Sequence, residues 1–249
     1  MPVVFFIEGG SGMRQIVQPH LERAGFLTQA LSAEANIVQR AQQIHPALIM
    51  IDTMVGGGRG IERCRKIRAV QTLSRTPVIL LAAKSSEEER VAGLEAGADD
   101  YISDFSSGRE IIARLQAVVR RFSRLVPCAG IPQPSAAFAN FLAGTASTIK
   151  TGDIEIDTSS MRVMVRGSEI ATTTLEFRLI YYLSHHRACV FSRDQLLDAV
   201  WGTQYVSPRT VDACVRRLRH KLEPNRSSPT YLKTIRGAGY CLDPGIGQA

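Results

Sequence analysis

Residues 207–223 read SPRTVDACVRRLRHKLE and have the pattern of an amphipathic helix. Ser207 can cap the first free amides, and Pro208 suits the first helical position, where a backbone N–H has no partner inside the helix. Apolar residues recur at helical spacing along one side, at Val211, Val215, Leu218 and Leu222. The opposite side carries Arg209, Ala213, Arg216, Arg217 and His220.

A helix with an apolar back and an arginine front fits the major groove of DNA. Arginine pairs with guanine edges and also neutralises phosphates, and the small Ala213 allows a close approach. The alternative from this helix alone is a basic surface helix that binds nothing. Its surroundings in the sequence favour DNA.

Two helical patterns precede this helix, and each begins with the spacing of a capping box. Thr173 and Glu176 open the first, and Ser192 and Gln195 open the second. Short alternating runs at 153–157 and 162–166 come earlier and predict a small antiparallel sheet. The runs YLKTI (231–235) and GYCLD (239–243) follow the basic helix and flank the turn 236–239, which predicts a hairpin with a basic tip. Three helices, the third basic, and then a hairpin predict an α+β winged helix-turn-helix domain over residues 150–246.

The first half of the chain has a different pattern. Short apolar runs alternate with amphipathic stretches, and the runs lie at 2–7, 26–31, 47–51, 77–81 and 100–102. The amphipathic stretches include 13–24, 59–70, 86–96 and 108–121. Apolar runs with little alternation are typical of strands buried on both faces, so the pattern predicts an α/β doubly wound five-stranded parallel sheet over residues 1–122. Sites in such sheets lie at the carboxyl ends of the strands, here at Glu8, Asp52, Ala82 and Asp104.

Composition and charge limit the classes of function that the chain could have. The stretch at 123–149 is rich in Pro, Ala, Ser and Gly and predicts a linker between the two domains. The formal net charge is +7, with +2 over residues 1–122 and +5 over residues 123–249, so the second half is where a polyanion would bind. Five scattered cysteines suit a reducing compartment and form no zinc motif. We expect a cytoplasmic protein without a membrane segment or metal, and no nucleophile–base pair indicates an enzyme.

Several segments together resemble one protein family. In the second domain they are LEFRLIYYL, SRDQLLDAVWG, RTVDACVRRLRHKLE and TIRGAGY, and the similarity runs from about Gly152 to Asp243. The first domain resembles a CheY-like receiver through ALIMID, PVILLAAK and EAGADDYI. The chain is therefore similar to OmpR/PhoB-type response regulators. The resemblance implies a transcription regulator that binds tandem DNA half-sites as a dimer.

The resemblance also assigns residues to the DNA. These are Arg209, Ala213, Arg216, Arg217, Arg219, Thr234, Arg236 and Tyr240. Arg217 and Ala213 also lie on the groove side that helical periodicity predicts. Arg219 lies off that side and is predicted to bind phosphate, whereas Arg236 is the minor-groove candidate. The expected partner is double-stranded DNA, with RNA polymerase as a further partner.

The receiver resemblance is incomplete at its reaction site. A working receiver needs two adjacent acids and an aspartate to hold Mg²⁺ and accept phosphoryl, with a hydroxyl residue and a lysine to bind its oxygens. Here Asp52 matches the phospho-acceptor and Glu8 the first acid. Gly9, Ala82 and Asp104 stand where the second acid, the hydroxyl and the lysine belong. We therefore expect Asp52 to accept phosphate poorly, with no cofactor and no firm Mg²⁺ site.

A set of residues with interleaved charge signs matches the face through which active family members dimerise. They are Arg90, Glu95, Asp99, Asp100, Glu110, Arg114 and Arg121. A two-fold axis would pair these opposite charges. Tyr101 matches the family's switch aromatic, but Ala82 offers it no hydroxyl partner. The expectation is a dimer that forms without phosphorylation. A conventional phospho-aspartate switch and a receiver that senses a small ligand stay open as alternatives.

Overall fold

The computed structural model describes residues 3–10, 12–23, 25–32, 36–103, 111, 114, 115, 118, 148–201, 208–225 and 228–243. The chain divides into two compact units, Met1–Gln133 and Pro134–Ala249. Of the linker predicted at 123–149, only residues 148 and 149 are described, and they belong to strand β6 (Thr148–Thr151). Regular structure of the second unit therefore begins at least two residues before the predicted start at 150.

A parallel sheet of five strands organises the first unit, as the sequence predicted. The strands are β1 (Val3–Ile7), β2 (Leu27–Leu31), β3 (Leu48–Asp52), β4 (Val78–Ala82) and β5 (Asp100–Ser103). Their order in the sheet is β2-β1-β3-β4-β5. Each strand begins and ends within one residue of its predicted apolar run, because strands buried on both faces leave a continuous hydrophobic signal. The predicted doubly wound fold is confirmed.

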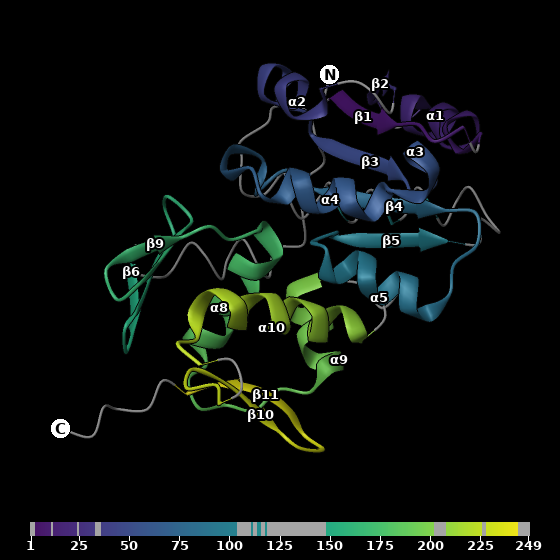
Figure 1. Ribbon diagram of the computed structural model, residues 1–249. Helices are drawn as coiled ribbons and strands as arrows, with labels where there is room; N and C mark the ends of the chain where they lie inside the picture. Colours follow the sequence, from purple (N-terminus) through teal and green to yellow (C-terminus); the bar gives the residue numbers. More distant parts are fainter. Residues whose placement is uncertain are drawn as a thin grey trace. The chain divides into compact units, whose positions relative to one another are not determined.

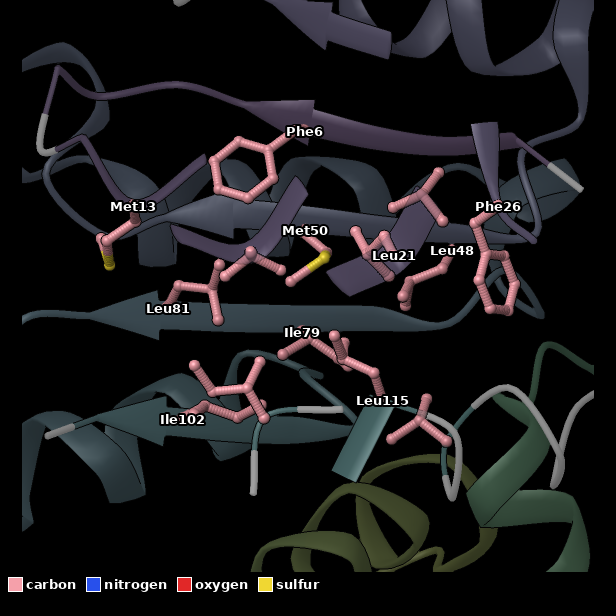
Figure 2. Close-up of a cluster of buried hydrophobic side chains, with 14 residues drawn as sticks. Phe6, Met13, Leu21, Phe26, Leu48, Met50, Ile79, Leu81, Ile102 and Leu115 are labelled. Atoms are coloured by element: carbon pink, nitrogen blue, oxygen red, sulfur yellow. The ribbon is translucent and has the colours of Figure 1, made fainter. Parts of the chain in front are cut away.

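Helices connect the strands and cover both faces of this sheet (Figure 1). They are α1 (Met13–Arg23), α2 (Ile37–Ile44), α3 (Val55–Gly58), α4 (Gly60–Arg68), the 3₁₀ turn Gln71–Leu73 and α5 (Glu87–Glu95). Figure 2 shows one face of the core, where Met13 and Leu21 of α1 and the helical residue Leu115 pack against Phe6, Met50, Ile79 and Leu81 of the strands. This cluster lies along one face of the sheet, between the strands and the helices that cover them.

A buried ion pair lies at the amino ends of β4 and β5. Arg68, the last residue of α4, has its Nη2 at 2.5 Å from Asp99 Oδ2, and both side chains are buried. The same guanidinium donates from Nε to the Gly97 carbonyl (2.8 Å) and from Nη1 to the carbonyls of Leu73, Ser74 and Thr76. Asp99 also accepts the Val78 N–H at 2.8 Å. One arginine therefore ties together the segments that lead into β4 and β5.

The second unit has the predicted winged-helix order. A four-stranded antiparallel sheet comes first, with β6, β7 (Ile154–Asp157), β8 (Arg162–Val165) and β9 (Ser168–Ile170) in sequence order. Three helices follow, α8 (Thr174–His185), α9 (Arg193–Leu196), which continues as a π-helical turn at Leu197–Trp201, and α10 (Arg209–Leu222). The hairpin β10 (Leu232–Ile235) and β11 (Gly239–Leu242) completes the unit beside these helices (Figure 1).

The local signals that predicted these helices are present. Thr173 and Glu176 form a capping box at the start of α8, and Ser192 and Gln195 form one at the start of α9. The predicted apolar side of α10 is buried, since Val211, Val215, Leu218 and Leu222 are at most 1% exposed. Pro208 precedes α10 with a helical backbone, and Ser207 lies outside the described residues.

Candidate nucleic-acid interface

Helix α10 presents a basic face. Arg209, Arg216 and His220 are exposed, and Asp212 and Arg219 are partly exposed beside them. Ala213 is only 3% exposed, so it does not lie on this face. The predicted side is therefore exposed at Arg209, Arg216 and His220 but not at Ala213, and the exposed face is turned toward Asp212 and Arg219. We name the surface of Arg209, Arg216 and His220 the basic face.

Arg217 points inward, contrary to the prediction. Its Nε donates to Glu176 Oε1 at 2.9 Å, and Lys221 Nζ donates to Glu176 Oε2 at 2.6 Å. Glu176 belongs to α8 and has no exposed side-chain surface. Burial alone would raise the pKa of Glu176, but Arg217 and Lys221 outweigh it and hold the pKa at about 2. The helical wheel of α10 cannot show this pair, because the acid comes from another helix.

The hairpin joins the basic face through its own polar groups. Arg236 and Thr234 are exposed at and beside the hairpin turn, as predicted for a wing. Arg219 does not extend freely, because its Nε and Nη2 donate to the Leu232 carbonyl (2.9 and 2.7 Å) and its Nη2 donates to Thr234 Oγ1 (2.7 Å). Tyr240 is 5% exposed, and its hydroxyl donates to Asp212 Oδ1 at 2.6 Å.

Asp52, the last residue of β3, has a buried carboxylate that accepts hydrogen bonds from the backbone. This carboxylate is 1% exposed, Oδ2 accepts the Gly9 N–H (3.1 Å), and Oδ1 accepts the Met54 N–H (2.9 Å). A Cβ at position 9 would lie 2.5 Å from the Val55 nitrogen and 2.8 Å from Asp52 Oδ2. The backbone after β3 therefore occupies the space that a second acid would need.

The other described residues of this region do not complete a magnesium site. Glu8 forms an ion pair with Arg14 of α1, Ala82 has no hydroxyl, and Asp104 lies outside the described residues. Mg²⁺ takes oxygen ligands in near-octahedral geometry, usually one or two carboxylates together with several waters. The described residues contain no cluster of three or more His, Cys, Asp or Glu side chains that could hold a metal.

The predicted pairing face is only partly a surface. Arg90 is exposed on α5, and Glu95 is partly exposed. Asp99 is buried against Arg68, so its assignment to an interface is wrong. Asp100 is also buried, and its Oδ1 accepts the Tyr101 N–H (2.8 Å) and lies 3.9 Å from Arg114 Nη1. Glu110 and Arg121 lie outside the described residues.

Three residues that matter for this site were not singled out for it from sequence. The sequence predicts Glu176 only as part of a helix cap and assigns no role to Asp212 or Arg193. Arg193 Nε donates to Asp212 Oδ1 at 2.7 Å. The available signal was that Asp212 is the one acid among the basic residues of α10.

Comparisons with known proteins match two domain families to the chain. The family model described as "Response regulator receiver domain" matches residues 4–116, and "Transcriptional regulatory protein, C terminal" matches residues 167–242. The transcriptional regulatory protein AfsQ1 of Streptomyces coelicolor is 37% identical over 245 residues, covering 98% of this chain and 99% of that protein. The phosphate regulon transcriptional regulatory protein PhoB of Rhizobium meliloti is 36% identical over 244 residues, with the same coverage of both chains.

A solved structure shares the overall fold. A mutant of the protein RitR matches with a TM-score of 0.74 and 20% identity, over 98% of this chain and 100% of that chain. At this identity the match concerns the fold alone. Among the described residues, no helix is long and apolar enough to cross a membrane.

Proposed function

Because the chain belongs to the OmpR/PhoB family of response regulators, we propose that it regulates transcription as a dimer that binds duplex DNA without phosphorylation of Asp52. The family makes it a DNA-binding response regulator. Dimerisation and independence from phosphorylation are the parts that we propose.

The basic face supports the mode of DNA binding. Helix α10 is fixed to its unit by buried apolar residues, which leaves Arg209 and Arg216 on the exposed side. A recognition helix placed in the major groove would bring these guanidinium groups to base edges or phosphates. The exposed Arg236 of the wing would then reach the minor groove or the neighbouring backbone.

The observation that supports the proposed independence from phosphorylation is the packing around Asp52. Phosphoryl transfer needs a carboxylate oxygen that can attack, and a cation that neutralises the incoming charge. Both oxygens of Asp52 accept backbone N–H groups, and the place of the second acid is filled by the chain after β3. Tyr101, which matches the family's switch aromatic, is already buried at 6% exposure without a hydroxyl at position 82.

Acetyl phosphate with Mg²⁺ tests this part. We expect the intact mass of the protein to stay unchanged and its affinity for a promoter fragment to be the same before and after the treatment. A response regulator with all five pocket residues serves as the positive control for the reagent. Stoichiometric gain of one phosphate at Asp52, together with tighter DNA binding, would contradict the proposal.

Dimerisation through the α5 and β5 face is the other part. Exposed ion pairs contribute only about 0–1 kcal/mol each, so several contacts must act together. Arg90 is the one basic residue of α5, is exposed, and could be placed by a two-fold axis opposite an acid of the second copy. Sedimentation of the unmodified protein at micromolar concentration should show a dimer, and Arg90→Glu should shift it toward monomer. A wild-type protein that sediments only as monomer would refute this part.

Two further expectations follow from the proposed role. A regulator bound to a promoter lies beside RNA polymerase, so contact with RNA polymerase stays a prediction. Its place of action is where the DNA is, which we infer to be the cytoplasm.

A further inference from the structure

Three side chains from three elements meet beside the basic face. Asp212 Oδ1 of α10 accepts the Tyr240 hydroxyl at 2.6 Å and Arg193 Nε at 2.7 Å. Arg193 also donates from Nη2 to the Tyr240 oxygen at 3.2 Å. The three groups therefore form a closed triangle that joins α9, α10 and strand β11 of the wing.

A second connection runs parallel to the first. Arg219 of α10 holds the Leu232 carbonyl and the Thr234 hydroxyl on the other wing strand. Its guanidinium carbon lies 5.9 Å from the centre of the Tyr240 ring, and that of Arg193 lies 5.1 Å from it. Tyr240 is thus enclosed by cations and by one carboxylate. Burial and Asp212 raise the pKa of Tyr240 to about 12, so its hydroxyl keeps the proton that it donates.

The backbone places Tyr240 in this position. Tyr240 and Phe191 exchange two backbone hydrogen bonds of 2.9 Å, which fixes β11 against the segment before α9. Gly239 permits this approach, because a Cβ there would lie 1.9 Å from the Phe191 carbonyl oxygen. The root of the wing is therefore fixed by backbone contacts, and its link to α10 depends on side chains.

We propose that Asp212 and Tyr240 are positioning residues that hold the wing and helix α10 in one fixed geometry, so that both elements engage DNA at the same time. The proposal rests on the proposed function, in which α10 and the wing bind duplex DNA. An acid among the arginines of a DNA-binding helix repels phosphates, and here its carboxylate is compensated by Arg193. Asp212 therefore acts within the protein, by binding Arg193 and Tyr240, and not on the DNA. Two contacts held at a fixed spacing bind together without a further ordering cost, whereas an untethered wing loses that advantage.

Tyr240→Phe tests the proposal, with Tyr231→Phe as a matched control. Tyr231 donates its hydroxyl to Asp153 Oδ2 at 2.8 Å, so each variant removes one hydroxyl bonded to a carboxylate within the same unit. Wild-type protein first selects its preferred site from random duplexes. Tyr240→Phe should then lower the affinity for that site about tenfold, the usual effect of one hydrogen bond to a charged group. Its affinity for unrelated duplex should change less than about twofold, and Tyr231→Phe should leave the ratio of the two affinities unchanged.

Asp212→Ala and Asp212→Asn separate the geometry from the charge. Both variants remove one negative charge, so both should strengthen non-specific binding to the same small extent. Only asparagine keeps an Oδ1 that accepts from Tyr240 and Arg193, so Asp212→Asn should retain more of the preference for the selected site.

Three results are decisive. A site preference that Tyr240→Phe reduces and Tyr231→Phe does not supports the proposal. Equal preferences in those two variants, or in the two Asp212 variants, overturn it while the proposed function stands. A wild-type protein that selects no sequence at all overturns the proposed function itself.

Discussion

Position 9 offers a quantitative test of how the Asp52 region is packed. Gly9→Ala adds one methyl group, whose carbon would lie 2.5 Å from the Val55 nitrogen and 2.7 Å from the Met54 carbonyl carbon. Ordinary van der Waals contact is 3.4–4 Å, and the atoms in the way belong to the backbone. Either Gly9 or the turn after β3 must therefore move by about 1 Å, and Asp52 loses good geometry with one of its two amide donors.

The expected free-energy change follows from these contacts. Overfilling a packed site usually costs about 1–3 kcal/mol. A hydrogen bond to a charged acceptor contributes about 1.5–3 kcal/mol, and the distorted geometry loses only part of it, about 1 kcal/mol. We therefore expect Gly9→Ala to destabilise the first unit by about 2–4 kcal/mol. Gly9→Asp should cost more, because it places a second carboxylate beside Asp52, and two charges 4 Å apart repel by about 4 kcal/mol at an effective dielectric constant of about 20.

Urea unfolding of the whole chain measures this with an internal control. Trp201 is the only tryptophan of the sequence and is buried in the second unit, so its fluorescence reports that unit. Far-ultraviolet circular dichroism reports both units. With a slope of about 2 kcal/mol per molar urea, a loss of 2–4 kcal/mol lowers the midpoint of the first unit by about 1–2 M. The Trp201 transition should not move.

Two outcomes would refute the reasoning about position 9. An unchanged circular dichroism midpoint in Gly9→Ala would mean that the turn after β3 does not fill this space. A Gly9→Asp protein that is as stable as wild type and binds Mg²⁺ would mean that the pocket lacks only one side chain. In that case Asp52 would be a dormant phospho-acceptor and the packing argument would fail.

Three further predictions concern the second unit. Glu176→Gln should destabilise it by about 3–5 kcal/mol, because Arg217 and Lys221 lose a buried partner, and the Trp201 urea midpoint measures this. Because the folded pKa of Glu176 lies at about 2, below its value of 4.5 in the absence of interactions, the stabilisation is full above pH 4.5 and is lost as the pH falls toward 2. Arg216→Ala should weaken DNA binding in a gel-shift assay with little loss of stability. Arg217→Ala should instead lower the stability of the second unit more than Arg216→Ala does, because it breaks the pair with Glu176. The reverse ranking of the two variants would contradict the orientation of α10.

Much of the fold was predictable because its signals are local. The buried strands of the first unit are continuous apolar runs, and both capping boxes can be identified from residues three positions apart. Strand β6 was not predicted, because its residues Thr148–Thr151 are mostly polar and follow a stretch rich in Pro and Ser. Edge strands bury few side chains and leave a weak pattern.

The candidate site was predictable in kind but not in orientation. The apolar side of α10 was correct, yet Ala213 is buried and Arg217 is turned toward Glu176 of α8. Asp99 was assigned to a surface because its position matches the family's dimerisation face, whereas Arg68, 31 positions earlier, draws it into the interior. In both cases the deciding partner is distant in sequence and opposite in charge, so no pattern within one element reveals it.

The role of Arg68 has a consequence for natural variation in this protein. A lysine at this position would preserve the formal charge, but a single ammonium group cannot span four carbonyl oxygens and the Asp99 carboxylate as the planar guanidinium does. Such a substitution would look conservative, and it changes no residue of the basic face or of the Asp52 region. Its effect would fall on cellular abundance, since the destabilised chain is degraded more often, and the genes under its control would respond to a lower dose of regulator.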